Sequence, residues 1–243
     1  GQMVSFVLFM VFQYTCNREV PAGVRYLIPE GKVMKEILSV GFPAIIMQAV
    51  GSFLTYGVNV IFGTLSASAV TAYGVYYKIQ QFAFFAAFGM NNAMIPVIAF
   101  NHGSGDKERV RAGIRWGMMD TLVIMGVCLA VLEVCASQIV GIFALTQQTL
   151  TLCTRAVRTI ALGYLFAGAN IAYQGVFQAL GRGVPSMVRC LVRQLLAALP
   201  LAWLFTLLPN PEVWCWAAFP VAEGIGLLVA LVQRKRILPD VLN

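Results

Sequence analysis

The sequence predicts an all-α protein that crosses a membrane several times. Of its 243 residues, 59% are hydrophobic and only 11% are charged, a composition typical of polytopic membrane proteins. Residues 37–105 contain a single formal charge, Lys78, and are long enough for two spans of about 20 residues each. Backbone groups that face lipid must be satisfied within their own segment, and the alternating pattern of a β-barrel is absent. Helices are therefore the expected form.

Two segments precede the first complete span. Residues 1–15 are uncharged but too short to span comfortably, so we expect them to be the end of a transmembrane helix that begins upstream. Residues 16–36 mix four basic and three acidic residues with two prolines and read as a linker between lobes. Part of this linker is either an amphipathic segment on the membrane surface or an ordinary solvated connector.

Six apolar runs follow, and together they predict a six-helix transmembrane lobe over residues 37–233. A polar segment at 137–155 is expected to hold the outer loop and a short helix, and residues 234–243 form a tail. The predicted spans are 37–63, 69–100, 114–136, 156–180, 187–208 and 213–232.

Lysine and arginine are distributed unevenly between the two sides of this bundle. Fourteen of the 17 lie in 16–36, 101–115, 181–193 and 234–236, whereas the connections 64–68 and 207–212 have none. The positive-inside rule therefore places the linker 16–36 and the C-terminus in the cytoplasm. Six spans then start and end on the inside. Residues 1–15 must descend from the outer face, which implies a further block of helices upstream.

Several functional classes are excluded by the same counts. The net charge of +7 would suggest a nucleic-acid partner in a soluble protein, but here the basic residues lie between apolar stretches. Six cysteines without a C-x-x-C pair, with one histidine, give no metal site. The carboxylates of Asp120, Glu133 and Glu223 fall at different depths of their spans. We therefore expect no enzyme.

Two ionisable residues lie well inside predicted spans, where a charge costs about 2.5–3.5 kcal/mol on insertion scales. Glu223 is near the middle of the sixth span and either hydrogen-bonds to a neighbouring helix or handles a cation or proton. Lys78, about a third of the way into the second span, either pairs with a carboxylate or carbonyls or contacts substrate.

Uncharged polar residues form stripes on two apolar helices. Spacings of 8 and 3 in the first span, and of 3, 1 and 4 in the fourth, place each set on one helical face. Such stripes indicate either a water-accessible cavity or hydrogen bonds between helices. The two sets are Gln48, Tyr56 and Asn59, and Asn170, Tyr173, Gln174 and Gln178.

Five strings, in order along the chain, resemble the multidrug and toxic compound extrusion (MATE) family. They are GFPAIIMQ, YKIQQFAFFAAFGMNNAMIPVIAFNHGSGD, FQALGRG, RQLLAALPLAWL and AFPVAEGIGLL. By this resemblance the chain is similar to the carboxy-terminal six-helix lobe of a twelve-helix antiporter. The resemblance implies export of organic cations or amphipathic drugs across the cell membrane in exchange for Na⁺ or H⁺, with alternating access between two lobes.

The expected partners are membrane lipid, the drug and the N-terminal lobe, with no cofactor other than the coupling ion. One branch of the family holds that ion with carboxylates on its seventh and tenth helices, but 37–63 and 156–180 contain no Asp or Glu. The coupling site then lies in the other lobe, or Glu223 substitutes.

We expect Pro43 to let the first span bend. The residues expected to line the cavity are Gln48, Tyr56, Asn59, Lys78, Gln81, Asn170 and Gln174. The alternative function is a flippase for a lipid-linked or polysaccharide precursor, which shares this architecture. A flippase cavity should carry several cationic residues for phosphates, and of the residues expected to line this cavity only Lys78 is cationic.

Overall fold

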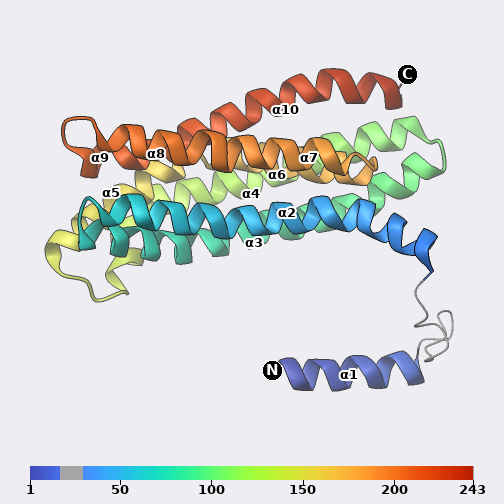
Figure 1. Ribbon diagram of the computed structural model, residues 1–243, viewed down its shortest axis with the longest axis horizontal. Helices are drawn as coiled ribbons and strands as arrows, with labels where there is room; N and C mark the ends of the chain where they lie inside the picture. Colours follow the sequence, from blue (N-terminus) through green and yellow to red (C-terminus); the bar gives the residue numbers. More distant parts are fainter. Residues whose placement is uncertain (17–29, 243) are drawn as a thin grey trace. The chain divides into compact units, whose positions relative to one another are not determined.

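The computed structural model describes residues 1–16 and 30–242, and every regular element in these ranges is a helix (Figure 1). The chain divides into two units, residues 1–42 and 43–243, which are described separately. The all-α prediction is confirmed.

The first unit contains α1 (Gln2–Thr15) and the beginning of α2 (Gly31–Gly63). Helix α1 has 14 residues, is uncharged and buries none of its side chains. At 1.5 Å per residue it extends for about 21 Å, less than the thickness of a bilayer core. Because α2 begins at Gly31, the last six residues of the predicted linker are helical. Residues 17–29 of that linker lie outside the described residues.

Five helical stretches of the described chain are long and apolar enough to cross a membrane, and a bent pair makes a sixth. The prediction of a multi-pass lobe is thereby confirmed. The elements after α2 are α3 (Ala67–Gly103), α4 (Lys107–Gly141), α5 (Gln147–Ala161), α6 (Tyr164–Ala179), α7 (Gly183–Leu191), η2 (Val192–Ala198), α8 (Leu199–Thr206), α9 (Pro211–Trp214), η3 (Cys215–Ala217) and α10 (Ala218–Leu242).

The fourth span differs in its bounds and shape from the predicted span over 156–180. It begins at Gln147 as α5 and bends by 50° before continuing as α6. A Cβ on Gly163, at the bend, would lie 2.8 Å from the Cα of Pro220 in α10. Glycine is therefore needed there for the two backbones to approach each other.

The C-terminal residues also differ from the expected tail, because α10 continues to Leu242. Ile237 and Leu238 pack against a core cluster that includes Met94 of α3 and Val110 of α4. This end of the chain is thus part of the helical lobe.

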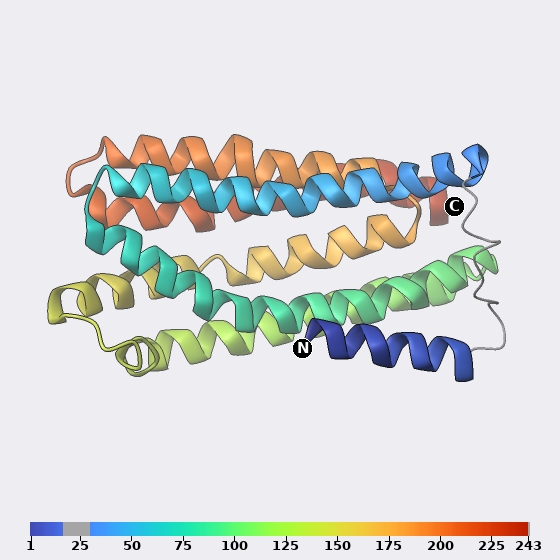
Figure 2. The same ribbon diagram turned by 60° about the horizontal axis from the view of Figure 1, so that its bottom comes forward.

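Successive connections alternate between the two ends of the second unit (Figures 1 and 2). The turns after α2, α4 and α8 lie at one end. The turns after α3 and α6 lie at the other, together with the end of α10. This is the arrangement that the distribution of basic residues predicted, although which end faces the cytoplasm stays a prediction.

Helix α6 lies at the centre of the lobe and packs against α3, α4, α7 and α10 (Figure 2). Most of its side chains are buried. Small residues allow this close packing: a Cβ on Gly175 would collide with Asn91 of α3, and one on Gly168 would lie 2.8 Å from Met125 of α4.

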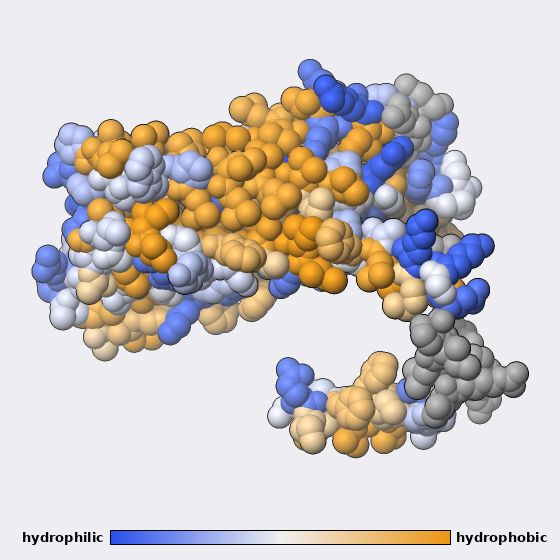
Figure 3. Space-filling view, in the orientation of Figure 1, coloured by the Kyte–Doolittle hydropathy of each residue, from blue (hydrophilic) through white to orange (hydrophobic). Residues whose placement is uncertain are grey.

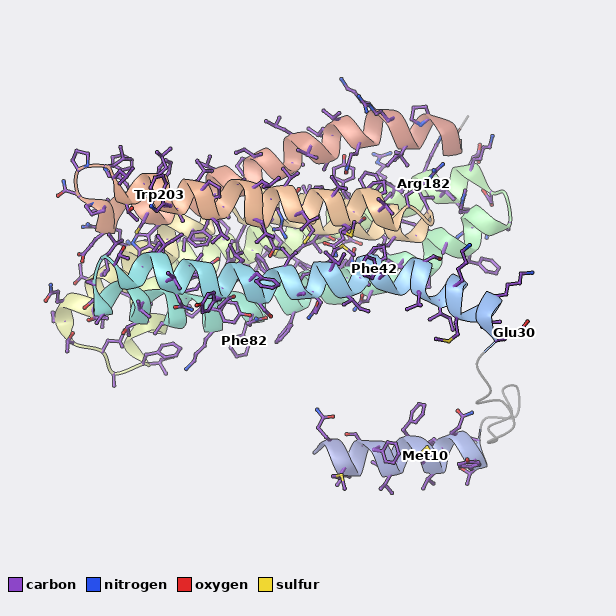
Figure 4. The ribbon with its side chains drawn as sticks, in the orientation of Figure 1. Met10, Glu30, Phe42, Phe82, Arg182 and Trp203 are labelled. Atoms are coloured by element: carbon purple, nitrogen blue, oxygen red, sulfur yellow. The ribbon has the colours of Figure 1, made fainter. Side chains whose placement is uncertain are left out.

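The outer surface carries a broad apolar band between more polar ends (Figure 3). Phe82 of α3 and Trp203 of α8 lie on this outer surface (Figure 4), and are 81% and 57% exposed. A band of this kind is expected where helices face lipid.

Candidate functional site

A partly open cavity of about 480 Å³ lies between α2, α3, the α5–α6 bend, η2 and α10. This volume is within the range of small-molecule sites, about 300–1,000 Å³. Aromatic rings dominate the wall. They are Tyr73, Tyr76, Tyr77, Phe84, Phe85, Phe88, Tyr164 and Phe219.

The polar part of the wall consists mainly of side-chain amides and one ion pair. The amides are Gln48, Gln80, Gln81, Asn92 and Gln194. Arg193 and Glu223 are the charged residues that line the cavity within the described part of the chain. That part holds no group of three or more His, Cys, Asp or Glu residues that could bind a metal ion.

Glu223 of α10 is held by partners from two other helices. Its Oε1 forms an ion pair with Nη1 of Arg193 from η2. The Asn170 side-chain amide of α6 donates to Glu223 Oε2 and to the Glu223 backbone carbonyl, both at 2.9 Å. The Arg193 and Glu223 side chains are only 13% and 17% exposed. Such a pair is favourable only when geometry and extra hydrogen bonds offset desolvation, and Asn170 supplies those bonds.

Two local features position Arg193. The residue lies in the π-helical turn η2, which ends two residues before Pro200. The proline ring clashes with the carbonyl of the preceding turn, and its nitrogen has no hydrogen to donate, so a regular α-helical turn is disfavoured there. Because residue 226 of α10 is a glycine, the aliphatic part of the Arg193 side chain can pack closely against α10. A Cβ at Gly226 would lie 2.8 Å from Arg193 Cδ and 3.1 Å from Asn170 Nδ2.

The placement of Arg189 and Arg193 corrects the interpretation of 181–193 as a basic loop. Arg189 is 3% exposed within α7, with its guanidinium 5.6 Å from the Phe177 ring centroid, and Arg193 lines the cavity. Of the three arginines, only Arg182 lies in the connection. The two helical arginines enter the bundle because each has a partner there: an aromatic ring for one and a carboxylate for the other.

Of the residues predicted to line the cavity, Gln48 and Gln81 do so, and Glu223 lies beside them. Tyr56 is 71% exposed and is not part of the wall. Asn59 donates to the carbonyl of Thr55 in its own helix.

The other predicted residues have different surroundings. Lys78 Nζ lies 5.9 Å from the ring centroid of Phe143. Asn170 holds Glu223, and the carbonyl of Gln174 accepts a hydrogen bond from Ser186. Within the polar stripe of the fourth span, the side chains of Asn170 and Tyr173 contact α10, through Glu223 and Arg234. Pro43 lies inside α2 and is buried, so its effect on bending stays a prediction.

Sequence reasoning missed Arg193 and most of the aromatic wall. A signal for the arginine existed, because Arg189 and Arg193 are four residues apart and share one face of an otherwise apolar helix. The aromatic residues gave no such signal, since rings on a membrane helix face lipid as readily as a cavity.

The comparisons with known proteins agree with this architecture. A sequence model of MatE matches residues 43–204, about two thirds of the chain. The chain belongs to the MatE family. The family resemblance is thereby confirmed, and the members of this family are transporters and not enzymes.

Among curated MATE relatives, the multidrug export protein MepA of Staphylococcus saprophyticus is 24% identical over 99% of this chain and 53% of its own length. MepA of Staphylococcus haemolyticus is 26% identical over 74% of this chain and 40% of its own length. The chain therefore spans about half the length of the curated relatives that it matches.

Two solved structures show the same fold. An outward-facing multidrug resistance MATE transporter of the MOP superfamily superposes with a TM-score of 0.89 at 19% identity, covering 99% of this chain and 55% of that one. A MOP superfamily transporter from Pyrococcus furiosus, described as having a binding pocket of reverse polarity, gives 0.87 at 18% identity, with coverage of 99% and 55%.

Proposed function

We propose that this chain is the carboxy-terminal lobe of a multidrug exporter that exchanges organic cations or amphipathic drugs for Na⁺ or H⁺. In this proposal an N-terminal lobe completes the transporter, and alternating access arises from movement of the two lobes. The protein lies in the cytoplasmic membrane, with residues 16–36 and the C-terminus in the cytoplasm.

The observation that supports this function best is the composition of the cavity wall. Aromatic rings attract cations through their faces, and side-chain amides hydrogen-bond without imposing one partner geometry. One carboxylate, Glu223, supplies negative charge. A wall of this kind suits flat, cationic molecules of varied shape better than one precise substrate.

The ion pair between Arg193 and Glu223 provides a way to exchange one cation for another in the cavity. Arg193 is a cation tethered to the wall, and it already occupies the Glu223 carboxylate. A drug cation, Na⁺ or H⁺ that reaches this carboxylate must compete with the arginine. When that cation leaves, Arg193 returns to Glu223, so that no buried charge is left alone.

The test is dye efflux from cells that produce the full-length protein, with sodium and pH gradients applied separately. We expect Gln81→Ala, in the cavity wall, to lower efflux several-fold at unchanged membrane abundance. Asn59→Ala, outside the wall, is the matched control and should retain efflux. Equal efflux by both variants and the wild type would overturn the assignment of this cavity. Efflux that needs neither gradient would overturn cation coupling.

The flippase alternative requires a surplus of positive charge to hold phosphates. Arg193 does add a cation to the cavity, but Glu223 balances it. Lys78, the cation considered from sequence, is not part of the wall. The cavity charge thus favours drug export.

A further inference from the structure

A groove of about 820 Å³ lies between the beginning of α4 and the end of α10. This groove is separate from the cavity that Arg193 and Glu223 line, and the two share no lining residue. Its wall has a basic part and an aliphatic part. The basic part is Arg111, Arg234 and Lys235, and the aliphatic part includes Leu228, Leu231 and Val232.

The basic part lies at the end of the lobe that holds the α3–α4 connection (Figure 1). Nη1 of Arg234 donates to the hydroxyl of Tyr173 on α6 at 3.2 Å, which fixes one side of its guanidinium. The Lys235 side chain is exposed. Among the described residues that line the groove, none is acidic. In the space-filling view, hydrophilic side chains around the end of α10 directly adjoin the apolar band (Figure 3).

The aliphatic part begins about two helical turns earlier on α10. Leu228 and Val232 are 64% and 55% exposed, on a helix apolar enough to cross a membrane. Lys235 lies seven positions after Leu228, which is about 10 Å along the helix. A ligand that fills the groove must therefore carry an anionic group at one end and a hydrocarbon chain at the other.

We propose that this groove binds one anionic phospholipid. Its phosphodiester lies between Arg234, Lys235 and Arg111, and an acyl chain runs along Leu228 and Val232. Basic pockets between transmembrane helices at a membrane face are suited to anionic headgroups. Positive charge alone would accept any anion, but the aliphatic wall is open where α10 crosses the membrane, so the occupant is a lipid. This inference does not depend on drug transport.

The experiment uses native mass spectrometry of the full-length protein with dioleoylphosphatidylglycerol and, as the neutral comparison, dioleoylphosphatidylcholine. We expect phosphatidylglycerol to be retained preferentially. Lys235→Gln should weaken its binding about fivefold, from about 1 kcal/mol per basic residue at an anionic lipid. Arg234→Gln combined with Lys235→Gln should weaken it further.

The matched control is Arg236→Gln, which removes the same charge from the next residue, outside the groove wall. It should leave lipid binding unchanged. Equal losses from Lys235→Gln and Arg236→Gln would overturn the site in favour of a diffuse surface charge. Equal retention of the two lipids, or displacement of phosphatidylglycerol by excess inorganic phosphate, would also overturn it. The Lys235 and Arg236 side chains are both exposed, so both variants should unfold at the wild-type temperature, and this measurement is the folding control.

Discussion

Replacing Glu223 by glutamine should destabilise the lobe strongly, because it leaves the Arg193 guanidinium without a counter-charge. Breaking a buried ion pair from one side typically costs 3–5 kcal/mol. Here the two side chains keep 13% and 17% exposure and border a cavity, so some solvation remains. We therefore expect Glu223→Gln to lower the free energy of unfolding by about 3 kcal/mol, the lower end of that range.

The reverse change, Arg193→Gln, should be milder. A lone carboxyl group can take up a proton and become neutral, whereas a guanidinium stays charged. We expect a loss of about 1.5 kcal/mol, similar to that of other buried polar groups left without a partner. The double variant removes both charges, so it should be more stable than Glu223→Gln alone.

The assay is the unfolding midpoint of the full-length protein in detergent, measured for the wild type, both single variants and the double variant. This double-mutant cycle isolates the pairwise interaction from the cost of each substitution. Two results would contradict this reasoning: Glu223→Gln is no more destabilising than Arg193→Gln, or the double variant is less stable than Glu223→Gln alone. Either result would mean that Glu223 does not stabilise the Arg193 guanidinium. The proposed exchange would then lose its basis.

Three further predictions concern packing and topology. Gly226→Ala should destabilise the lobe by about 1–3 kcal/mol, because the added Cβ overpacks against Arg193. The control is Gly224→Ala, whose Cβ would meet no atom within 4 Å and which should be neutral or stabilising. Thermal unfolding of both variants measures the difference. Gly163→Ala should also lower the unfolding midpoint, because its Cβ would lie 2.8 Å from the backbone of α10; an unchanged midpoint would contradict this packing. A cysteine at position 64 (Thr64→Cys) should react with an impermeant thiol reagent in intact cells, and one at position 104 (Ser104→Cys) only after permeabilisation. Labelling of both from the same side would contradict the proposed topology.

The membrane spans were predictable because the hydrocarbon core imposes a length of about 20 apolar residues whatever the later packing. The alternation of the connections followed from the same runs. Breaks within a helix are different, because they depend on what packs beside them. The bend at Gly163 reflects the close approach of Pro220, which lies 57 positions further along the chain. A local pattern does not contain that information.

The candidate site was only partly predictable, for a related reason. Gln48 was found as part of a polar stripe, but Tyr56 and Asn59 of the same stripe lie outside the wall, because periodicity assigns a face and not the neighbour that covers it. Arg193 was assigned to a loop because counting basic residues treats every arginine near a span end as solvated. Its burial follows from Glu223, which the sequence shows, and from Gly226, whose role becomes clear only when the two helices are in contact.

The central position of α6 has a consequence for how the lobe is assembled during synthesis. The side chains of Asn170 and Tyr173 find their partners, Glu223 and Arg234, 53 and 61 positions later in the chain. When α6 leaves the ribosome, α10 has not yet been made. The Asn170 and Tyr173 side chains therefore lack these hydrogen-bond partners, in the translocon or in lipid, until α10 has been inserted. A nascent chain stopped before Glu223 should consequently be a target for the quality-control proteases of the membrane.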